Sequence, residues 1–260
     1  MDCFYTLQNA WPAKVETPAA IGTKLLRMLD DLEAAGGSFA DWGLWAEPME
    51  LDPDFDPDDP KDAEFLEPDR LSQVRGRIAR LVSANVSRDD GEEDIDSGYS
   101  IFGRSRTSSQ TSRVALTVVA GSKRTNYVAM DAGSMMQAPD PSMIEFQPFK
   151  AALLAVATNW PCPWASVGAF PLLNFNARSF ELPKPFDWRP IFGMAWMGYL
   201  SAERANGLVV PHELVTERLP DGGLLLVSAE EPLDADNPRH VKAAALLGDI
   251  LAERGGKPAR

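Results

Sequence analysis

A block of short β-rich runs in the middle of the chain constrains the fold more than any other stretch. Residues 97–130 contain SGYSIFG, RVALTVVAG and NYVAM, separated by the polar segments RSRTSSQTS and SKRT. Runs rich in Val, Ile, Tyr and Phe that polar clusters interrupt are typical of strands. The pattern predicts antiparallel strands with exposed connections.

Further strands are expected in the last third. The candidates are GMAWMGYL, ELVTERL and GLLLVSAE, and Asp221-Gly222-Gly223 between the last two is typical of a hairpin turn. The apolar run at 191–200 is about half as long as a membrane span and therefore predicts a buried strand.

Four stretches carry apolar residues at helical spacing. The first starts at the capping pair Thr17-Pro18, the second near Pro68, the third spans 146–160 and is closed by Pro161, and the fourth follows Asn237-Pro238. The buried positions expected in these helices are, in chain order, Ile21, Leu25, Met28, Leu32, Leu71, Val74, Ile78, Leu81, Phe149, Leu153, Val156, Trp160, Val241, Ala244, Leu247 and Leu251.

Grouped strands with helices before and after them indicate the α+β class. We expect an antiparallel sheet, or sheets, packed by about four helices, with a long acidic Pro-rich loop near residues 47–69. A chain of 260 residues is long enough for one large domain, and we predict one over 1–260. A division would fall between 1–143 and 144–260.

Acidic residues are concentrated near the N-terminus. Residues 1–100 hold 23 acids and 9 bases, a charge of −14, whereas residues 101–260 hold 15 acids and 16 bases, a charge of +1. Such a chain is a poor binder of nucleic acid or anionic lipid, because phosphates require clustered Lys and Arg. The natural complement is a positively charged protein partner.

Two segments account for this charge. Residues 47–69 contain 11 acids against the single base Lys61, and residues 89–96 add six acids. One interpretation is a solvated loop, neutralised in part by the arginines of the following helix; the other is a surface that imitates a polyanion and docks on a basic cleft. The candidate partner-binding residues are Asp52, Asp54, Asp56, Asp58, Asp59, Asp89, Asp90, Glu92 and Glu93.

A calcium loop does not fit the first segment. Asp52, Asp54 and Asp56 match the first three ligands of an EF-hand, but Pro57 stands where glycine is needed and Ala63 where a bidentate Glu belongs.

Motifs for enzyme chemistry are weak. The chain has no Gly-x-Ser-x-Gly and no phosphate loop, and its two histidines are His212 and His240, the latter expected on the first turn of the last helix and facing solvent. Cys3 and Cys162 are not spaced as metal ligands and are expected to be buried thiols. We predict no enzyme, no metal and no cofactor.

Other features bear on partners and location. Six of the seven tryptophans are expected in the core and at its rim, where one or two could anchor a partner; they are Trp42, Trp45, Trp160, Trp164, Trp188 and Trp196. The start, MDCFYTLQNAW, lacks the basic and apolar regions of a secretory signal, so we expect a cytoplasmic protein without membrane contact. Whether the protein forms homo-oligomers is left open by the sequence.

The last third carries a group of motifs: W-M-x-Y-L-S at 196–201, paired strand candidates around Asp221-Gly222-Gly223, and D-N-P-x-H-V at 236–241. With the Thr-Pro helix and F-A-D-W at 39–42, these resemble the immunity protein 52 family of bacterial polymorphic-toxin systems. The resemblance implies an α+β protein encoded beside a toxin with a restriction-endonuclease-like nuclease domain, delivered by a secretion system such as type VI. It implies neutralisation by binding and not by catalysis.

Two other function classes compete with this hypothesis. One is a hydrolase that uses a carboxylate pair, whose spacing a sequence does not give. The other is a non-catalytic accessory protein of a secretion system. An enzyme should have a pocket with convergent polar groups, whereas an immunity protein should have a broad acidic or apolar surface patch.

Overall fold

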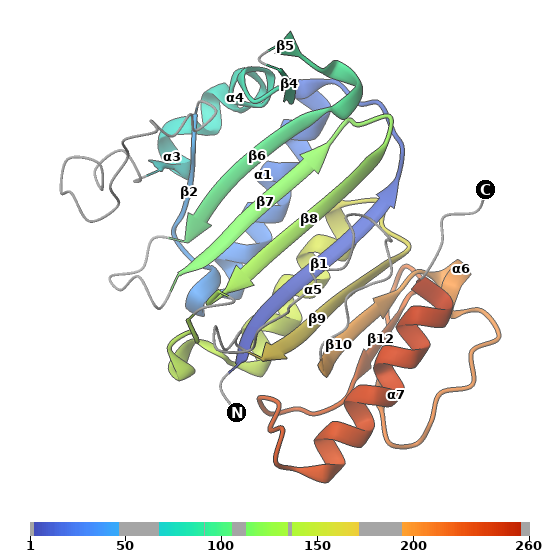
Figure 1. Cartoon of the computed structure of the whole chain (residues 1–260). Helices are drawn as coiled ribbons and strands as arrows, with labels where there is room; N and C mark the ends of the chain where they lie inside the picture. The colour runs from blue at the N-terminus through green and yellow to red at the C-terminus, as the bar shows by residue number, and fades with distance from the viewer. Residues whose placement is uncertain are drawn as a thin grey trace.

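A ten-stranded antiparallel sheet forms the centre of the computed structural model, which describes residues 3–46, 68–90, 92–105, 113–134, 137–171 and 194–255 (Figure 1). The strand order is β11-β12-β10-β9-β1-β8-β7-β6-β2-β3. The bounds are β1 Cys3–Pro12, β2 Trp42–Leu44, β3 Asp69–Arg70, β6 Tyr99–Ser105, β7 Val114–Ala120, β8 Thr125–Ala132, β9 Trp164–Pro171, β10 Met194–Leu200, β11 Val215–Arg218 and β12 Leu224–Val227. A separate hairpin pairs β4 (Arg88–Asp89) with β5 (Glu92–Glu93).

Helices cover the two faces of the sheet unequally. The helices are α1 Pro18–Ala35, α3 Leu71–Val74, α4 Ile78–Ala84, α5 Phe146–Asn159, α6 Ala202–Ala205 and α7 Pro238–Gly255. Figure 1 shows α1 and α5 behind the sheet and α7 in front of the strands at one side. Alternation along β12 agrees with this arrangement, because Leu225 and Val227 join the large core while Leu224 and Leu226 pack with α7. The predicted α+β class is confirmed.

The helix at the N-terminus begins where its capping pair predicts. The Thr17 hydroxyl accepts a hydrogen bond from the Ala20 N–H at 3.3 Å, and Pro18 occupies the first turn, where it loses no helical hydrogen bond. Ile21, Leu25 and Met28 are fully buried, as their spacing predicts, and so is Leu32.

The second predicted helix is interrupted. Its four apolar positions, Leu71, Val74, Ile78 and Leu81, are all buried, but a 3₁₀ turn over Arg75–Arg77 separates α3 from α4. Gly76 lies in the middle of this turn, and glycine is among the weakest helix formers. The apolar spacing correctly predicted which side of this segment is buried, but it did not predict that the helix is interrupted.

The two strands at the centre of the sheet, β1 and β9, escaped prediction, as did the short strands β2, β3, β4 and β5. β1 pairs with β8 on one side and β9 on the other. In β9 almost every residue is buried because α5 and α7 pack near opposite faces, so the strand lacks the alternation that marks half-buried strands. Its alanines and Gly168 further weaken the signal.

The hairpin predicted at Asp221-Gly222-Gly223 joins β11 to β12. Gly222 has φ of +84°, which glycine adopts without strain. The Asp221 carboxylate accepts hydrogen bonds from the Gly223 N–H at 2.8 Å and from the Tyr199 hydroxyl at 2.9 Å. The turn is thereby fixed to β10.

Two predicted burial patterns need correction. Val241 was expected in the buried stripe of the last helix, but it is 42% exposed, and His240 is buried instead. Of the two cysteines, Cys162 is buried as predicted, whereas Cys3 is only half-buried. The predicted core tryptophans Trp42, Trp160 and Trp196 are buried, and Trp188 lies outside the described residues.

Candidate functional site

The β4–β5 hairpin gathers four of the predicted acids at one end of the molecule. Asp89 lies across from Glu92, Glu93 across from Arg88, and Asp90 stands at the turn with φ of +48°. All four acids are exposed, and no Lys or Arg within the described ranges is recorded in an ion pair with them. Like charges this close repel one another, so the hairpin favours a cationic partner.

The segment that follows the hairpin is anchored by a network of hydrogen bonds. The Asp94 carboxylate accepts hydrogen bonds from the Ser97 hydroxyl and from the backbone N–H groups of Asp96 and Ser97. These bonds, that from the Ser97 hydroxyl above all, lower the pKa of Asp94. The network fixes the base of the hairpin.

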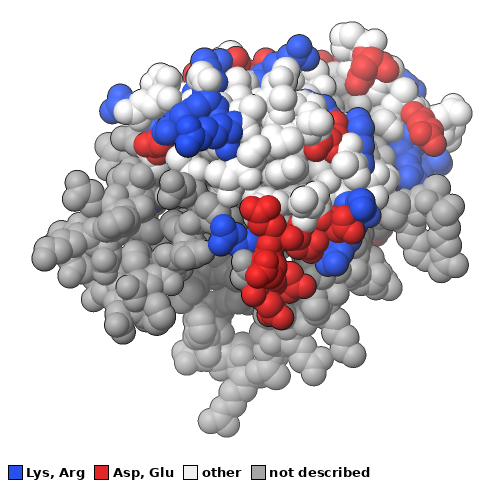
Figure 2. Space-filling view, turned by 90° about the horizontal axis from the view of Figure 1, so that it is seen from above, with Lys and Arg blue, Asp and Glu red and all other residues white. Residues whose placement is uncertain are grey.

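Two bases compensate this second group of acids. Lys123 pairs with Asp96 at 2.7 Å, and the Arg124 guanidinium lies 3.8 Å from Asp94. Figure 2 shows the acidic side chains gathered between Lys and Arg side chains, at the end of the molecule where Figure 1 places β4 and β5. The uncompensated charge is therefore that of the hairpin itself.

The other five predicted acids, Asp52, Asp54, Asp56, Asp58 and Asp59, lie outside the described residues. Just after them, Asp69 pairs with Arg77 at 2.7 Å, as expected if the following helix neutralises part of the acidic stretch. Arg75 instead binds Asp30 of α1, and its hydrogen bonds lower the pKa of that carboxyl.

Both histidines line one pocket of about 500 Å³ beside the first turn of α7. His240 was predicted to face solvent, but it is only 8% exposed. Its Nδ1 accepts the backbone N–H of Asp234 at 3.1 Å, so the ring proton sits on Nε2 and is donated to Glu231 Oε1 at 2.9 Å. The side chain joins the helix to the loop before it.

A serine, a histidine and a carboxylate meet in this pocket without forming a nucleophilic triad. The Ser228 hydroxyl lies within 3.0 Å of the backbone oxygens of Ala195 and Trp196. Both nitrogens of His240 are occupied, so neither is left to accept the Ser228 proton. In the described part of the chain, no three His, Cys, Asp or Glu side chains are grouped to hold a metal ion.

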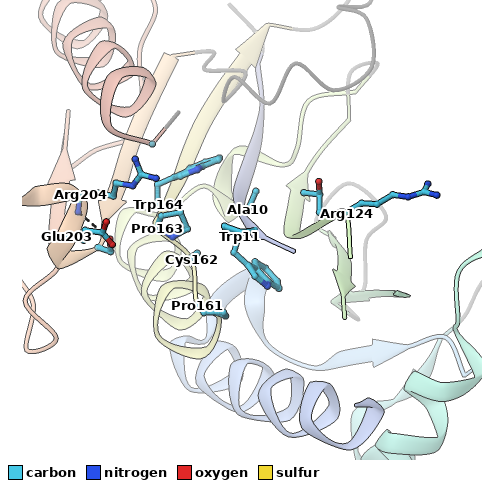
Figure 3. A pocket seen from close by; sticks show the side chains of 13 residues that line it. Ala10, Trp11, Arg124, Pro161, Cys162, Pro163, Trp164, Glu203 and Arg204 are labelled. Carbon is cyan, nitrogen blue, oxygen red and sulfur yellow. Dashed lines mark hydrogen bonds between the residues drawn. The ribbon is translucent and has the colours of Figure 1, made fainter. Parts of the chain in front are cut away.

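A second pocket, of about 460 Å³, lies where β1 and β8 meet the end of α5 and the start of α6 (Figure 3). Most of its wall is apolar, and Arg124, Glu203 and Arg204 stand among the polar lining residues. The apolar lining residues are Ala10, Trp11, Pro12, Pro161, Pro163 and Trp164. Cys162 also lines it, and burial raises the pKa of its thiol to about 11. The thiol is therefore protonated at neutral pH and is a poor nucleophile.

The sequence model of immunity protein 52 matches residues 2–257, almost the whole chain. The chain belongs to the immunity protein 52 family. Membership makes it an immunity protein, and the family implies a cognate toxin as its partner. Among curated proteins, no match was found.

A solved structure supports the fold of this family member. The Pseudomonas aeruginosa T6SS protein PA0821 is 14% identical and superposes with a TM-score of 0.52, covering all of this chain and 76% of the other. At this identity the likeness concerns the fold alone. Within the described ranges of the immunity protein, no helix is long and apolar enough to span a membrane.

Proposed function

We propose that this immunity protein neutralises a nuclease toxin by placing its acidic hairpin against the basic surface with which the toxin holds nucleic acid. Family membership supports the toxin as partner. The exposed, unpaired acids Asp89, Asp90, Glu92 and Glu93 carry the proposal for a basic surface. A nuclease cleft must be cationic to bind phosphates, so an anionic hairpin occupies it in place of the substrate.

The proposal includes the place of action. A toxin that cleaves nucleic acid has to be stopped where the nucleic acid is, so the immunity protein works in the cytoplasm of a cell exposed to a secreted toxin. The T6SS origin of the structural neighbour is compatible with delivery by a type VI system. Asp52, Asp54, Asp56, Asp58 and Asp59, which lie outside the described residues, stay proposed contributors of negative charge to toxin binding.

Co-expression with the toxin encoded by the neighbouring gene tests the function. Cells that make the toxin should survive only when the immunity protein is present, and the two proteins should co-purify. Absence of both protection and binding rejects the function itself. Protection from a toxin that leaves DNA and RNA intact rejects the nuclease as target.

A charge variant tests the surface. Changing Asp89, Asp90, Glu92 and Glu93 to Asn or Gln should slow association with the toxin about 10-fold or more at low salt, because steering by opposite charge is lost. The salt dependence of the association rate should flatten as well. Stopped-flow mixing or surface plasmon resonance measures both quantities.

A matched control removes the same charge elsewhere. Glu230, Asp236, Asp249 and Glu253 are exposed acids in or just before α7. Their neutralisation changes the net charge equally but leaves the hairpin intact, so association should keep most of its wild-type rate. Equal slowing by both variants would mean that net charge, not the hairpin, guides the toxin.

A further inference from the structure

The turn between β7 and β8 links the apolar pocket to the segment that follows the acidic hairpin. Ser122, Lys123 and Arg124 lie in the turn between β7 and β8, and their contacts hold residues 94–97 behind the hairpin. The Ser122 hydroxyl and the Lys123 N–H donate to the Asp96 carbonyl at 3.2 and 2.8 Å. Arg124, which faces Asp94, also lines the pocket. A partner that covers both the hairpin and this turn would reach the pocket.

Buried aromatic rings make the pocket wall rigid. Trp11 is 3% exposed and stacks on Trp160, with ring centroids 5.1 Å apart and planes 24° apart. Trp164 lies on the opposite face of the sheet from the Trp11 ring (Figure 3), and it packs so closely on Gly255 of α7 that a Cβ there would lie 2.9 Å from the ring. Neither indole can swing into the space without disturbing the core, so the cavity is preformed.

Exposed charge pairs alone give a complex little affinity. Each contributes about 1 kcal/mol or less, and their main effect is on the rate of encounter and on specificity. Tight interfaces usually add a few side chains that insert into preformed apolar pockets, where most of the binding free energy is concentrated. The cavity beside the β7–β8 turn offers such a pocket.

We propose that the pocket lined by Ala10, Trp11, Pro161 and Trp164 receives an aromatic or aliphatic side chain from the same toxin surface that meets the acidic hairpin. This inference rests on the proposed function. The hairpin guides the cationic toxin into place, and the pocket then holds it. The hairpin raises the association rate constant, and the pocket lowers the dissociation rate constant.

A second copy of this chain is the less favourable occupant. A two-fold symmetric dimer at this end would bring hairpin against hairpin, and the unpaired acids of both copies would repel one another. A cationic toxin surface meets no such repulsion.

Filling the pocket tests the inference. Ala10 is a half-buried lining residue on β1, and Thr125 lines the pocket from β8. Ala10→Phe and Thr125→Phe should each occupy the space and raise the dissociation rate of the complex with the purified, catalytically inactivated toxin about 30-fold. The association rate and its salt dependence should stay near wild type.

Ala115→Phe is the matched control, because Ala115 is an exposed position of β7 that does not line the pocket. Thermal melts and near-UV circular dichroism confirm that each variant is folded, and the second filling variant serves if the first does not fold. Wild-type dissociation rates in a folded filling variant overturn the inference. Unchanged toxin binding together with a changed oligomeric state or loss of a bound small molecule also overturns it, since the pocket then serves another occupant.

The outcomes separate the two proposals. If the wild-type protein does not bind the toxin, the proposed function fails. If it binds, and the charge variant slows association while the filling variants leave dissociation unchanged, the function stands and only the pocket is wrong.

Discussion

At the residue scale, His240 shows how one side chain can be structural where its chemistry suggests catalysis. Its ring uses one nitrogen as an acceptor and the other as a donor, and both partners, Asp234 and Glu231, lie in the loop before α7. The N-terminal residues of the helix are thereby tied to the preceding loop.

Replacing this histidine should cost stability. His240→Ala leaves the Asp234 N–H without its acceptor and opens a space beside the helix, so we expect a loss of about 1–3 kcal/mol in the free energy of unfolding. Urea denaturation measures the change. His212→Ala is the control, because the His212 side chain is 94% exposed and its loss should be nearly neutral.

The buried carboxyl of Asp131 predicts that the stability of the protein depends on pH. Burial raises the pKa of this carboxyl, which accepts a hydrogen bond from Thr6 at 2.7 Å. An acid with a raised folded-state pKa stabilises the fold below its unfolded pKa, and this contribution is lost as pH rises through the folded-state pKa. As pH rises from below the unfolded-state pKa through the folded-state pKa, the wild type should therefore lose stability relative to Asp131→Asn. Parallel melts of both proteins across this range should diverge; constant separation would contradict the assignment.

At the element scale, the 3₁₀ break between α3 and α4 illustrates what apolar spacing misses. The four apolar positions of that segment are buried on either side of the break. Spacing therefore identified a face but not the continuity of the backbone, which depends on local propensity at Gly76.

A pair of glycine substitutions checks this explanation. Gly76 is exposed, has no positive φ, and a Cβ there would meet nothing within 4 Å. Gly76→Ala should therefore stabilise the protein by about 0.5–1 kcal/mol. Gly222→Ala should destabilise it by about 1 kcal/mol, because Gly222 has φ of +84°. Equal effects of both changes on urea denaturation would refute the conformational account.

At the whole-molecule scale, the negative charge that we propose meets the toxin works against the fold. The acids of the hairpin repel one another when no partner is present, as functional surfaces often do. The four-residue charge variant should therefore melt about 2 °C higher than the wild type at low salt. The difference should shrink as added salt screens the charges, and a lower melting temperature at every salt concentration would contradict this reading.

Sequence reasoning reached the class of fold, three of the sheet's central strands and the acids of the hairpin, because these follow from local patterns. It did not reach β1 and β9, whose place in the sheet comes from long-range pairing. The pocket could not be predicted from the sequence either. Trp164 was recognised as an anchor candidate, but other lining residues come from β1, β8 and the loop before β9, and only the fold brings these segments around one cavity.

The position of β1 has a consequence for how the protein is made. This strand is synthesised before both of its partners, which begin at Thr125 and Trp164, so the centre of the sheet stays open until the second partner has been made. At typical translation rates of roughly 5–20 residues per second, the first strand waits about 10 s or longer for its second neighbour. Since long-range pairing also slows folding, a cell that meets the toxin depends on immunity protein it has already stored.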